Sequence, residues 1–200
     1  MPTTPQPLQR SPAIPRAERE RRVLDAAAEL FYARGVHEVG MDELIAATGL
    51  GKATVYRLFS TKDELIGAYL RRLARNILAA IDADIARHPD DPAAAIKAIF
   101  DAVGHDLARP GFRGCAFNNA SIEFSDPEHP ARRAARDYRA ELHRRLTDLA
   151  RATRPDTGPE LGAQLAVLID GMYTNAAHLG PTGPAATGPA LADALLREHR

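Results

Sequence analysis

The chain has 200 residues, 45% of them hydrophobic and 26% charged, and its 26 bases and 26 acids cancel to a net charge of zero. This length suffices for a sizeable buried core, while the apolar runs are too short to cross a membrane and the first residues hold no hydrophobic signal core. The single cysteine excludes an internal disulfide framework, and no two of the seven histidines have the i, i+4 spacing of a helical zinc site. We therefore expect a cytoplasmic protein with no membrane partner, no metal and no cofactor.

Residues 1–15 are rich in proline and contain no acid. This composition predicts a disordered, weakly basic arm. From residue 16 onward Ala, Leu, Arg and Glu dominate, and apolar residues recur at helical spacing, as at Val23, Ala27, Leu30 and Phe31. Glycines and prolines then divide the chain into about nine helices, so the predicted fold class is all-α.

Residues 40–59 have the spacing of a helix-turn-helix, with Gly49 and Leu50 in the turn. Leu44, Val55 and Phe59 are expected to face inward. The opposite face of the second helix then collects Lys52, Ala53, Tyr56 and Arg57. Such a face can enter a major groove, where a base bonds guanine, a small methyl-bearing side chain touches thymine and a tyrosine holds a phosphate.

The next helix opens with a capping box at Thr61 and Glu64, and its pattern runs unbroken to about Arg87. At 1.5 Å per residue it spans roughly 40 Å and can link the helix-turn-helix to a second domain. Its first amides and Lys62 suit a phosphate. Lys52, Arg57 and Lys62 thus form a local basic footprint, and the acids that cancel them are expected elsewhere. The alternative is that this short charge cluster is only a solvated face.

Polar residues interrupt the apolar helices of the second part. Asn119 and Glu123 are four residues apart on one expected helix, and the helix over 161–179 contains Asp170, Tyr173, Asn175 and His178. Buried polar groups need partners, so these side chains can line a ligand pocket. In the alternative reading, Glu123 pairs with a nearby arginine, while Asp170 and His178 serve a subunit interface or face water.

Cys115 is open to two interpretations. It could sense oxidants if Arg113 lowers its pKa, but its place between Gly114 and Ala116 favours a small buried side chain. The large apolar residues of this part are likewise either a wall for an apolar ligand or simple core: Phe100, Phe112, Phe117, Phe124, Met172 and Tyr173. We take the candidate ligand-binding residues to be Phe100, Cys115, Asn119, Glu123, Tyr138, Met172 and Tyr173.

Small residues point to helix pairing near the end of the chain. Over 161–179 they alternate with large aliphatic residues, and Leu191, Leu195 and Leu196 give the last helix one apolar stripe. The last two helices of two subunits can therefore form a four-helix interface, whereas the alternative is packing within one chain. A DNA site made of two symmetric half-sites is matched by a protein with twofold symmetry, which favours a twofold dimer.

The helix-turn-helix segment resembles the TetR family of bacterial transcriptional regulators over roughly residues 17–70. The residues that carry the resemblance are Met41, Asp42, Glu43, Leu44, Ala46, Ala47, Gly49, Leu50, Lys52, Thr54, Val55, Tyr56, Phe59, Lys62, Asp63 and Leu65. The chain departs from the family pattern at Gly40, Gly51, Leu58 and Thr61. Gly40 and Gly51 offer no hydroxyl to a phosphate, and Leu58 stands where the family commonly has a contact to the DNA backbone. We therefore expect Tyr56, Lys62 and the arm arginines, including Arg16, to make more of the phosphate contacts. Residues 114–124 and 168–180 also look like segments of one TetR subgroup.

The resemblance implies an arm over 1–15, a DNA-binding domain over 16–62 and a helical regulatory and dimerisation domain over 63–200. It further implies a homodimer, joined through the last two helices, that releases double-stranded operator DNA when a small-molecule effector enters the bundle. The candidate DNA-binding residues are Arg16, Gly51, Lys52, Ala53, Thr54, Tyr56, Arg57 and Lys62. An enzyme is not expected, because the sequence holds no nucleophile elbow, phosphate-cradling glycine loop or metal-ligand cluster, and no catalytic residue is assigned. The main rival is an architectural DNA-binding protein that needs no ligand.

Overall fold

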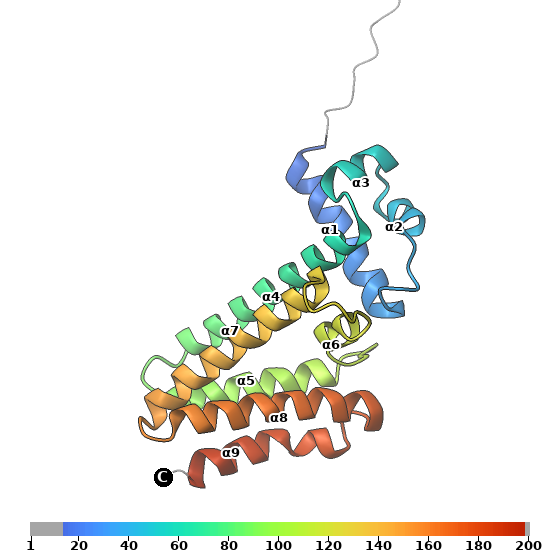
Figure 1. Cartoon of the computed structure of the whole chain (residues 1–200). Coiled ribbons are helices and arrows are strands. Elements are labelled where there is room, and N and C mark those ends of the chain that lie inside the picture. Colours follow the sequence, from blue (N-terminus) through green and yellow to red (C-terminus); the bar gives the residue numbers. More distant parts are fainter. Residues whose placement is uncertain (1–13, 199–200) are drawn as a thin grey trace, which may run out of the picture.

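The structure is a computed structural model that describes residues 14–198. Residues 1–13 of the expected basic arm lie outside the described residues. All regular structure in the described part is helical, which confirms the all-α prediction (Figure 1). The elements are α1 (Arg16–Arg34), α2 (Met41–Thr48), α3 (Lys52–Leu58), α4 (Lys62–Ala86), α5 (Pro92–Leu107), α6 (Ala116–Ser121), α7 (Pro130–Thr153), α8 (Gly158–Leu179), a 3-10 turn η1 (Pro184–Thr187) and α9 (Gly188–Glu198).

Helices α1 to α3 form a small head at one end of the molecule (Figure 1). The expected inward residues Leu44, Val55 and Phe59 are buried, each at most 5% exposed. Helix α2 ends at Thr48 and is capped by Gly49, whose φ of 66° lies in the left-handed region that glycine adopts without strain. The Thr48 hydroxyl donates to the Ile45 carbonyl and accepts from the Leu50 amide, so the turn into α3 is fixed on both sides.

Helix α4 runs from the head into the bundle and lies beside α7 (Figure 1). Its 25 residues begin after Thr61, whose hydroxyl accepts from the Glu64 amide at 3.1 Å. In a capping box the Glu64 carboxylate would accept from the amide of Thr61. Here it accepts instead from the amide and hydroxyl of Ser60, one residue earlier. The predicted long helix is confirmed, and the expected domain boundary after residue 62 falls in its first turn.

The bundle consists of α4, α5, α7, α8 and α9. Arg145 of α7 donates to both carboxylate oxygens of Asp82 on α4, at 2.7 and 2.9 Å, and its side chain is only 14% exposed. This bond lowers the pKa of Asp82. Helices α7 and α8 approach so closely that a Cβ at Gly162 would lie 2.6 Å from the Cα of Thr147. Small residues thus set the distance between these helices.

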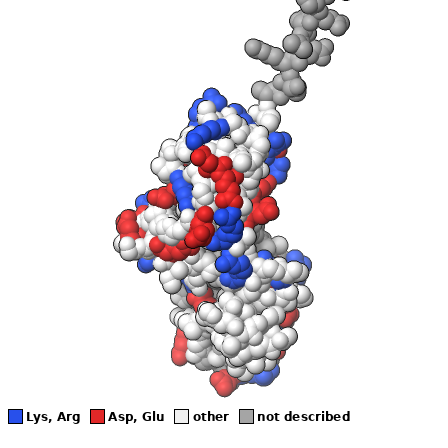
Figure 2. Space-filling view, turned by 90° about the vertical axis from the view of Figure 1, so that its right-hand side faces the viewer, with Lys and Arg blue, Asp and Glu red and all other residues white. Residues whose placement is uncertain are grey.

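Charged side chains are unevenly distributed on the face shown in Figure 2. Basic and acidic residues alternate over the upper part, where Figure 1 places the head, whereas the centre of the lower part is white and charged residues lie along its edges. Val167 and Leu179 of α8 are 72% and 62% exposed, and Leu191 of α9 is 49% exposed. Among the helices of the described part, none combines the length and apolar character needed to cross a membrane.

Candidate nucleic-acid interface and regulatory cavity

Helix α3 presents a continuous exposed face. Lys52, Ala53, Tyr56 and Arg57 are all exposed, while Val55 between them is fully buried against the head. Thr54 is half-buried beside them. The outward grouping expected from the helical repeat is therefore present, and the face has the size and chemistry to lie in a major groove.

The cations of this face already have partners in the free protein. Lys52 Nζ lies 2.8 Å from Asp42 Oδ1 on α2, and this carboxylate raises the pKa of Lys52. Arg57 lies back along its own helix, where its Nε donates to the Ala53 carbonyl at 3.2 Å. The expectation that the balancing acids lie elsewhere is therefore wrong for Lys52. Both contacts are exposed and weak, so the side chains can exchange them for DNA at little cost.

Two further cations border this face. Lys62 Nζ donates to the His37 carbonyl at 3.3 Å, which places its charge beside the first turn of α4. Arg16 is exposed at the first residue of α1. Gly51 is the N-terminal cap of α3 and makes no side-chain contact there, as expected from its lack of a hydroxyl. These positions suit phosphates because they combine charge with exposed helix starts.

A cavity of about 670 Å³ lies where α1, α4, α5, α6, α7 and α8 meet. Its wall is largely apolar and includes Leu73, Ile77, Ile81, Ile99, Val103, Phe117, Leu142 and Ile169. One end is polar. There Asp106 accepts from the Tyr173 hydroxyl at 2.8 Å and from Arg109 Nε at 2.7 Å, while the Arg109 guanidinium stands 4.5 Å from the centre of the Tyr32 ring. Burial and the Asp106 charge raise the pKa of Tyr173, so its phenol stays a neutral donor.

Three of the seven expected ligand-binding residues line this cavity: Cys115, Tyr138 and Tyr173. Phe100 and Met172 do not line it; both are buried in the packed core. A side chain added at Gly188 of α9 would meet the Met172 sulfur, which shows that Met172 faces α9. For Phe100 and Met172 the simple-core interpretation fits the structure, whereas Phe117 and Tyr173 belong to the cavity wall.

Asn119 and Glu123 lie outside the cavity. The expectation that they share a helix is wrong, because α6 ends at Ser121. Asn119 donates through Nδ2 to the Arg113 carbonyl at 2.8 Å. The Glu123 carboxylate instead accepts from the amides of Val36 and His37 in the loop between α1 and α2, at 3.4 and 3.3 Å. Glu123 therefore joins the bundle to the head rather than facing a ligand or a neighbouring arginine.

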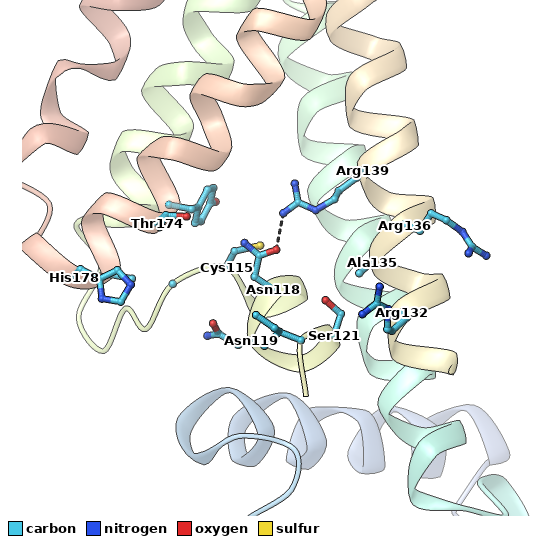
Figure 3. A pocket seen from close by; sticks show the side chains of 14 residues that line it. Cys115, Asn118, Asn119, Ser121, Arg132, Ala135, Arg136, Arg139, Thr174 and His178 are labelled. Atoms are coloured by element: carbon cyan, nitrogen blue, oxygen red, sulfur yellow. Dashed lines mark hydrogen bonds between the residues drawn. The ribbon is translucent and has the colours of Figure 1, made fainter. Parts of the chain in front are cut away.

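Asn119 lines a second, open groove between α6, α7 and α8 (Figure 3). In this groove Arg139 of α7 donates to Asn118 Oδ1 at 2.7 Å and pairs with Asp170 of α8, so it ties three helices together. Thr174 and His178 of α8 form the opposite border. Asp170 is therefore neutralised by an arginine, and His178 is exposed.

Burial dominates at Cys115. It raises the pKa of the thiol, although the amides of Asn118 and Phe117 and the charge of Arg139 oppose this. Arg113 is engaged elsewhere, because its guanidinium donates to the carbonyls of Tyr32 and Ala33 at the end of α1. The hypothesis that Arg113 lowers this pKa is therefore wrong. The half-buried Cys115 fits the other interpretation, in which it is a small packing side chain.

Several cavity residues were not anticipated from the sequence. Tyr32 and Glu29 belong to α1, which was assigned wholly to the head, yet both line the cavity. The Tyr32 hydroxyl donates to the Gly114 carbonyl at 3.1 Å and accepts from the Arg113 amide at 2.7 Å. The i, i+3 spacing of Asp106 and Arg109 could have indicated their ion pair, but no local signal reveals that Tyr32 folds over it.

A family model described as bacterial regulatory proteins of the tetR family matches residues 23–69. The HTH-type transcriptional activator FasR of Mycolicibacterium smegmatis is 38% identical over 96 residues, which is 46% of this chain and only 44% of that relative. The HTH-type transcriptional repressor Rv3405c of Mycobacterium tuberculosis is 28% identical over 167 residues, covering 84% of this chain and 76% of the relative.

Solved structures are similar over nearly the whole chain. The crystal structure of SCO4454, a TetR-family transcriptional regulator from Streptomyces coelicolor, aligns with a TM-score of 0.86 and 34% identity over 92% of this chain and 96% of that one. A TetR-type regulator from Streptomyces avermitilis aligns with a TM-score of 0.71 and 30% identity, over 88% of this chain and 97% of the other. The similarity therefore extends through the bundle as well as the head.

Proposed function

This chain belongs to the TetR family of DNA-binding transcriptional regulators, a family of regulators and not of enzymes, and from that premise we propose that it is a repressor released from its operator by a small molecule. The sign of regulation belongs to the proposal, because one relative is named an activator and another a repressor. The cavity supports ligand switching over an architectural role, since a protein that only bends DNA needs no cavity of this volume with converging polar groups.

One observation carries the proposal: two helices reach both the head and the cavity. Helix α4 begins at Lys62 next to the head and contributes Leu73, Ile77 and Ile81 to the cavity wall. Helix α1 packs in the head and contributes Tyr32 to the same wall. A molecule that binds better to one arrangement of these helices must shift the head toward that arrangement. If that arrangement does not hold DNA, the molecule lowers the affinity for the operator, and operator DNA lowers the affinity for the molecule by the same factor.

We assign the DNA contacts to the exposed face of α3 and its borders. Lys52, Ala53 and Arg57 face the bases, while the others hold the backbone: Arg16, Gly51, Thr54, Tyr56 and Lys62. Within the cavity we retain Cys115, Tyr138 and Tyr173 as effector contacts and replace the remaining expected residues by Tyr32, Asp106 and Arg109.

We assign the dimer interface to α8 and α9. Their exposed faces carry small and apolar residues, among them Ala163, Val167, Gly171 and Leu191, and a Cβ at Gly171 would meet nothing within 4 Å. Open space over a helical glycine lets the backbone of a second helix approach closely. A twofold dimer through this face presents two heads to two half-sites.

Replacing Lys62 by alanine should weaken binding about equally on all DNA sequences. The ammonium contacts a phosphate in this assignment, and a phosphate carries no base information. The slope of log affinity against log salt should fall by about one per subunit, measured by fluorescence anisotropy at several salt concentrations. Lys97→Ala is the matched control, because Lys97 pairs with Asp193 in the bundle. An unchanged salt slope in Lys62→Ala would remove Lys62 from the DNA contacts.

Filling the cavity should abolish the effector response without preventing operator binding. Val103→Trp places a ring in the cavity from α5, away from both helices that connect to the head. The effector is first found as the member of a metabolite library that releases labelled operator. Its calorimetric affinity for the free protein should then exceed that for the operator complex, and Val103→Trp should lose the response.

The matched control is Ala83→Trp, which adds the same ring to an exposed position of α4. It should respond to the effector as the unmodified protein does. Equal effector affinities with and without operator would contradict switching. A normal response in Val103→Trp would place the effector outside this cavity.

A further inference from the structure

The charge of the cavity lining is predominantly negative. Among the residues 14–198 that line it, four are carboxylates, namely Glu29, Asp84, Asp106 and Asp170, and one is a base, Arg109. Asp84 pairs with Arg87 and Asp170 with Arg139, neither of which lines the cavity. At the polar end the balance therefore rests on the pair formed by Asp106 and Arg109. A cation that displaces Arg109 meets the Asp106 carboxylate, whereas an anion in the same place meets repulsion.

Arg109 itself occupies a site built for a cation. Its Nε donates to Asp106 Oδ1 at 2.7 Å, and its guanidinium carbon lies 4.5 Å from the centre of the Tyr32 ring and 5.7 Å from that of Phe112. The Tyr173 hydroxyl holds the other oxygen of Asp106 at 2.8 Å. A carboxylate together with two aromatic rings is the arrangement that recognises guanidinium and ammonium groups.

We propose that Arg109 is an internal substitute for the ligand and that the effector is an apolar organic cation that displaces it from Asp106 and Tyr32. This inference rests on the proposed ligand-switched function and names the chemical class of its effector. The cationic group takes the place of the guanidinium, and the apolar remainder lies along the wall formed by Ile77, Val103 and Leu142. The Arg109 side chain, already 39% exposed, moves to solvent without leaving a buried charge unpaired.

Other ligand classes fit the site less well. An anion that separated Arg109 from Asp106 would then lie beside the Asp106 carboxylate, whose like charge repels it. A neutral ligand could fill the apolar wall but would leave the pair of Arg109 and Asp106 in place. Only a cation gains from the carboxylate and both rings at once.

Displacement of Arg109 has a direct route to the head. Arg109 lies between α5 and α6, in the segment that also contains Arg113 and Gly114. Arg113 donates to the carbonyls of Tyr32 and Ala33 at the end of α1, and the Gly114 carbonyl accepts from the Tyr32 hydroxyl. A ligand that takes the position of Arg109 therefore contacts the Tyr32 ring and disturbs the segment that holds α1.

Four compounds with an octyl or octanoyl chain test the ligand class by calorimetry on the full chain without DNA. Octylguanidinium copies the group of Arg109, octyltrimethylammonium keeps only its charge, octylurea is a neutral analogue of similar shape, and octanoate is an anion. Octylguanidinium should bind at least about tenfold tighter than octylurea, with octyltrimethylammonium between them and octanoate weakest. Binding of octanoate or octylurea as tight as that of octylguanidinium would overturn the proposal.

Variants test the displacement itself. Arg109→Ala removes the internal competitor, so octylguanidinium should bind about tenfold tighter than to the unmodified protein. Methylguanidinium at millimolar concentration should raise the melting temperature of Arg109→Ala and leave that of the unmodified protein unchanged. Asp106→Asn should lose the preference for octylguanidinium over octylurea. Arg144→Ala is the matched control, since Arg144 pairs with Glu141 and Asp148 on the surface of α7 and should bind as the unmodified protein does.

An unchanged affinity and no thermal response in Arg109→Ala would overturn the proposal, even if Asp106→Asn fails to fold. These outcomes are separate from those of the proposed function. If the library compound that releases the operator is neutral or anionic, the assigned ligand class is wrong but the switch stands. If octylguanidinium binds as expected and operator affinity does not change, the cation site stands and the switch fails.

Discussion

Replacing Gly162 by alanine should lower the free energy of unfolding by about 2 to 3 kcal/mol, although alanine favours helices by about 1 kcal/mol. The added Cβ would lie 2.6 Å from both the Cα and the hydroxyl oxygen of Thr147. A backbone atom cannot turn away as a side-chain tip can, so α7 and α8 must separate. The measurement is chemical denaturation at one protein concentration, because dimer formation makes stability depend on concentration.

Gly104→Ala provides the matched control within α5. A Cβ at Gly104 would meet nothing within 4 Å, so the substitution should raise the free energy of unfolding by about 0.5 to 1 kcal/mol. The two alanine variants should therefore differ in sign. Stabilisation by both would mean that α7 and α8 do not approach as closely as the structure shows.

Replacing Arg57 by alanine should relax base preference by about 1 to 3 kcal/mol at one position in each half-site. The side chain is exposed on α3 and is held by contacts within its own helix, so it is available to a base edge. Competition assays with operators mutated at single base pairs measure the effect. Lys62→Ala serves as the contrast, because it should weaken all of these operators alike. A uniform loss in Arg57→Ala would assign this arginine to the phosphates.

The head could be predicted from the sequence because its determinants are local. The apolar spacing at Leu44, Val55 and Phe59, the left-handed turn at Gly49 and the cap at Thr61 each act within a few residues. The basic footprint was predicted less well, since Lys52 and its partner Asp42 lie on different helices. Which acid meets which base depends on how the helices are packed against one another, and residue counts do not contain that information.

The cavity could be predicted only in outline. Polar residues within apolar helices indicated Tyr173, but Glu123 reaches the head because α6 stops at Ser121, a boundary that no strong breaker marks. Tyr32 lines the cavity because the end of α1 packs on the segment before α6, about 80 residues further along the chain. Such contacts between distant segments decide which side chains face a ligand, and they have no periodic signature in the sequence.

Selection of bound duplexes from a random DNA pool is the most direct test of the account that this protein reads an operator as a dimer. Two heads joined through α8 and α9 should enrich two inverted copies of one half-site, with centres about one helical turn or a multiple of it apart. The same selection with Arg57→Ala should lose preference at one symmetric pair of positions. A pool that stays random, with binding that depends on salt but not on sequence, would contradict the account and favour a nonspecific architectural protein.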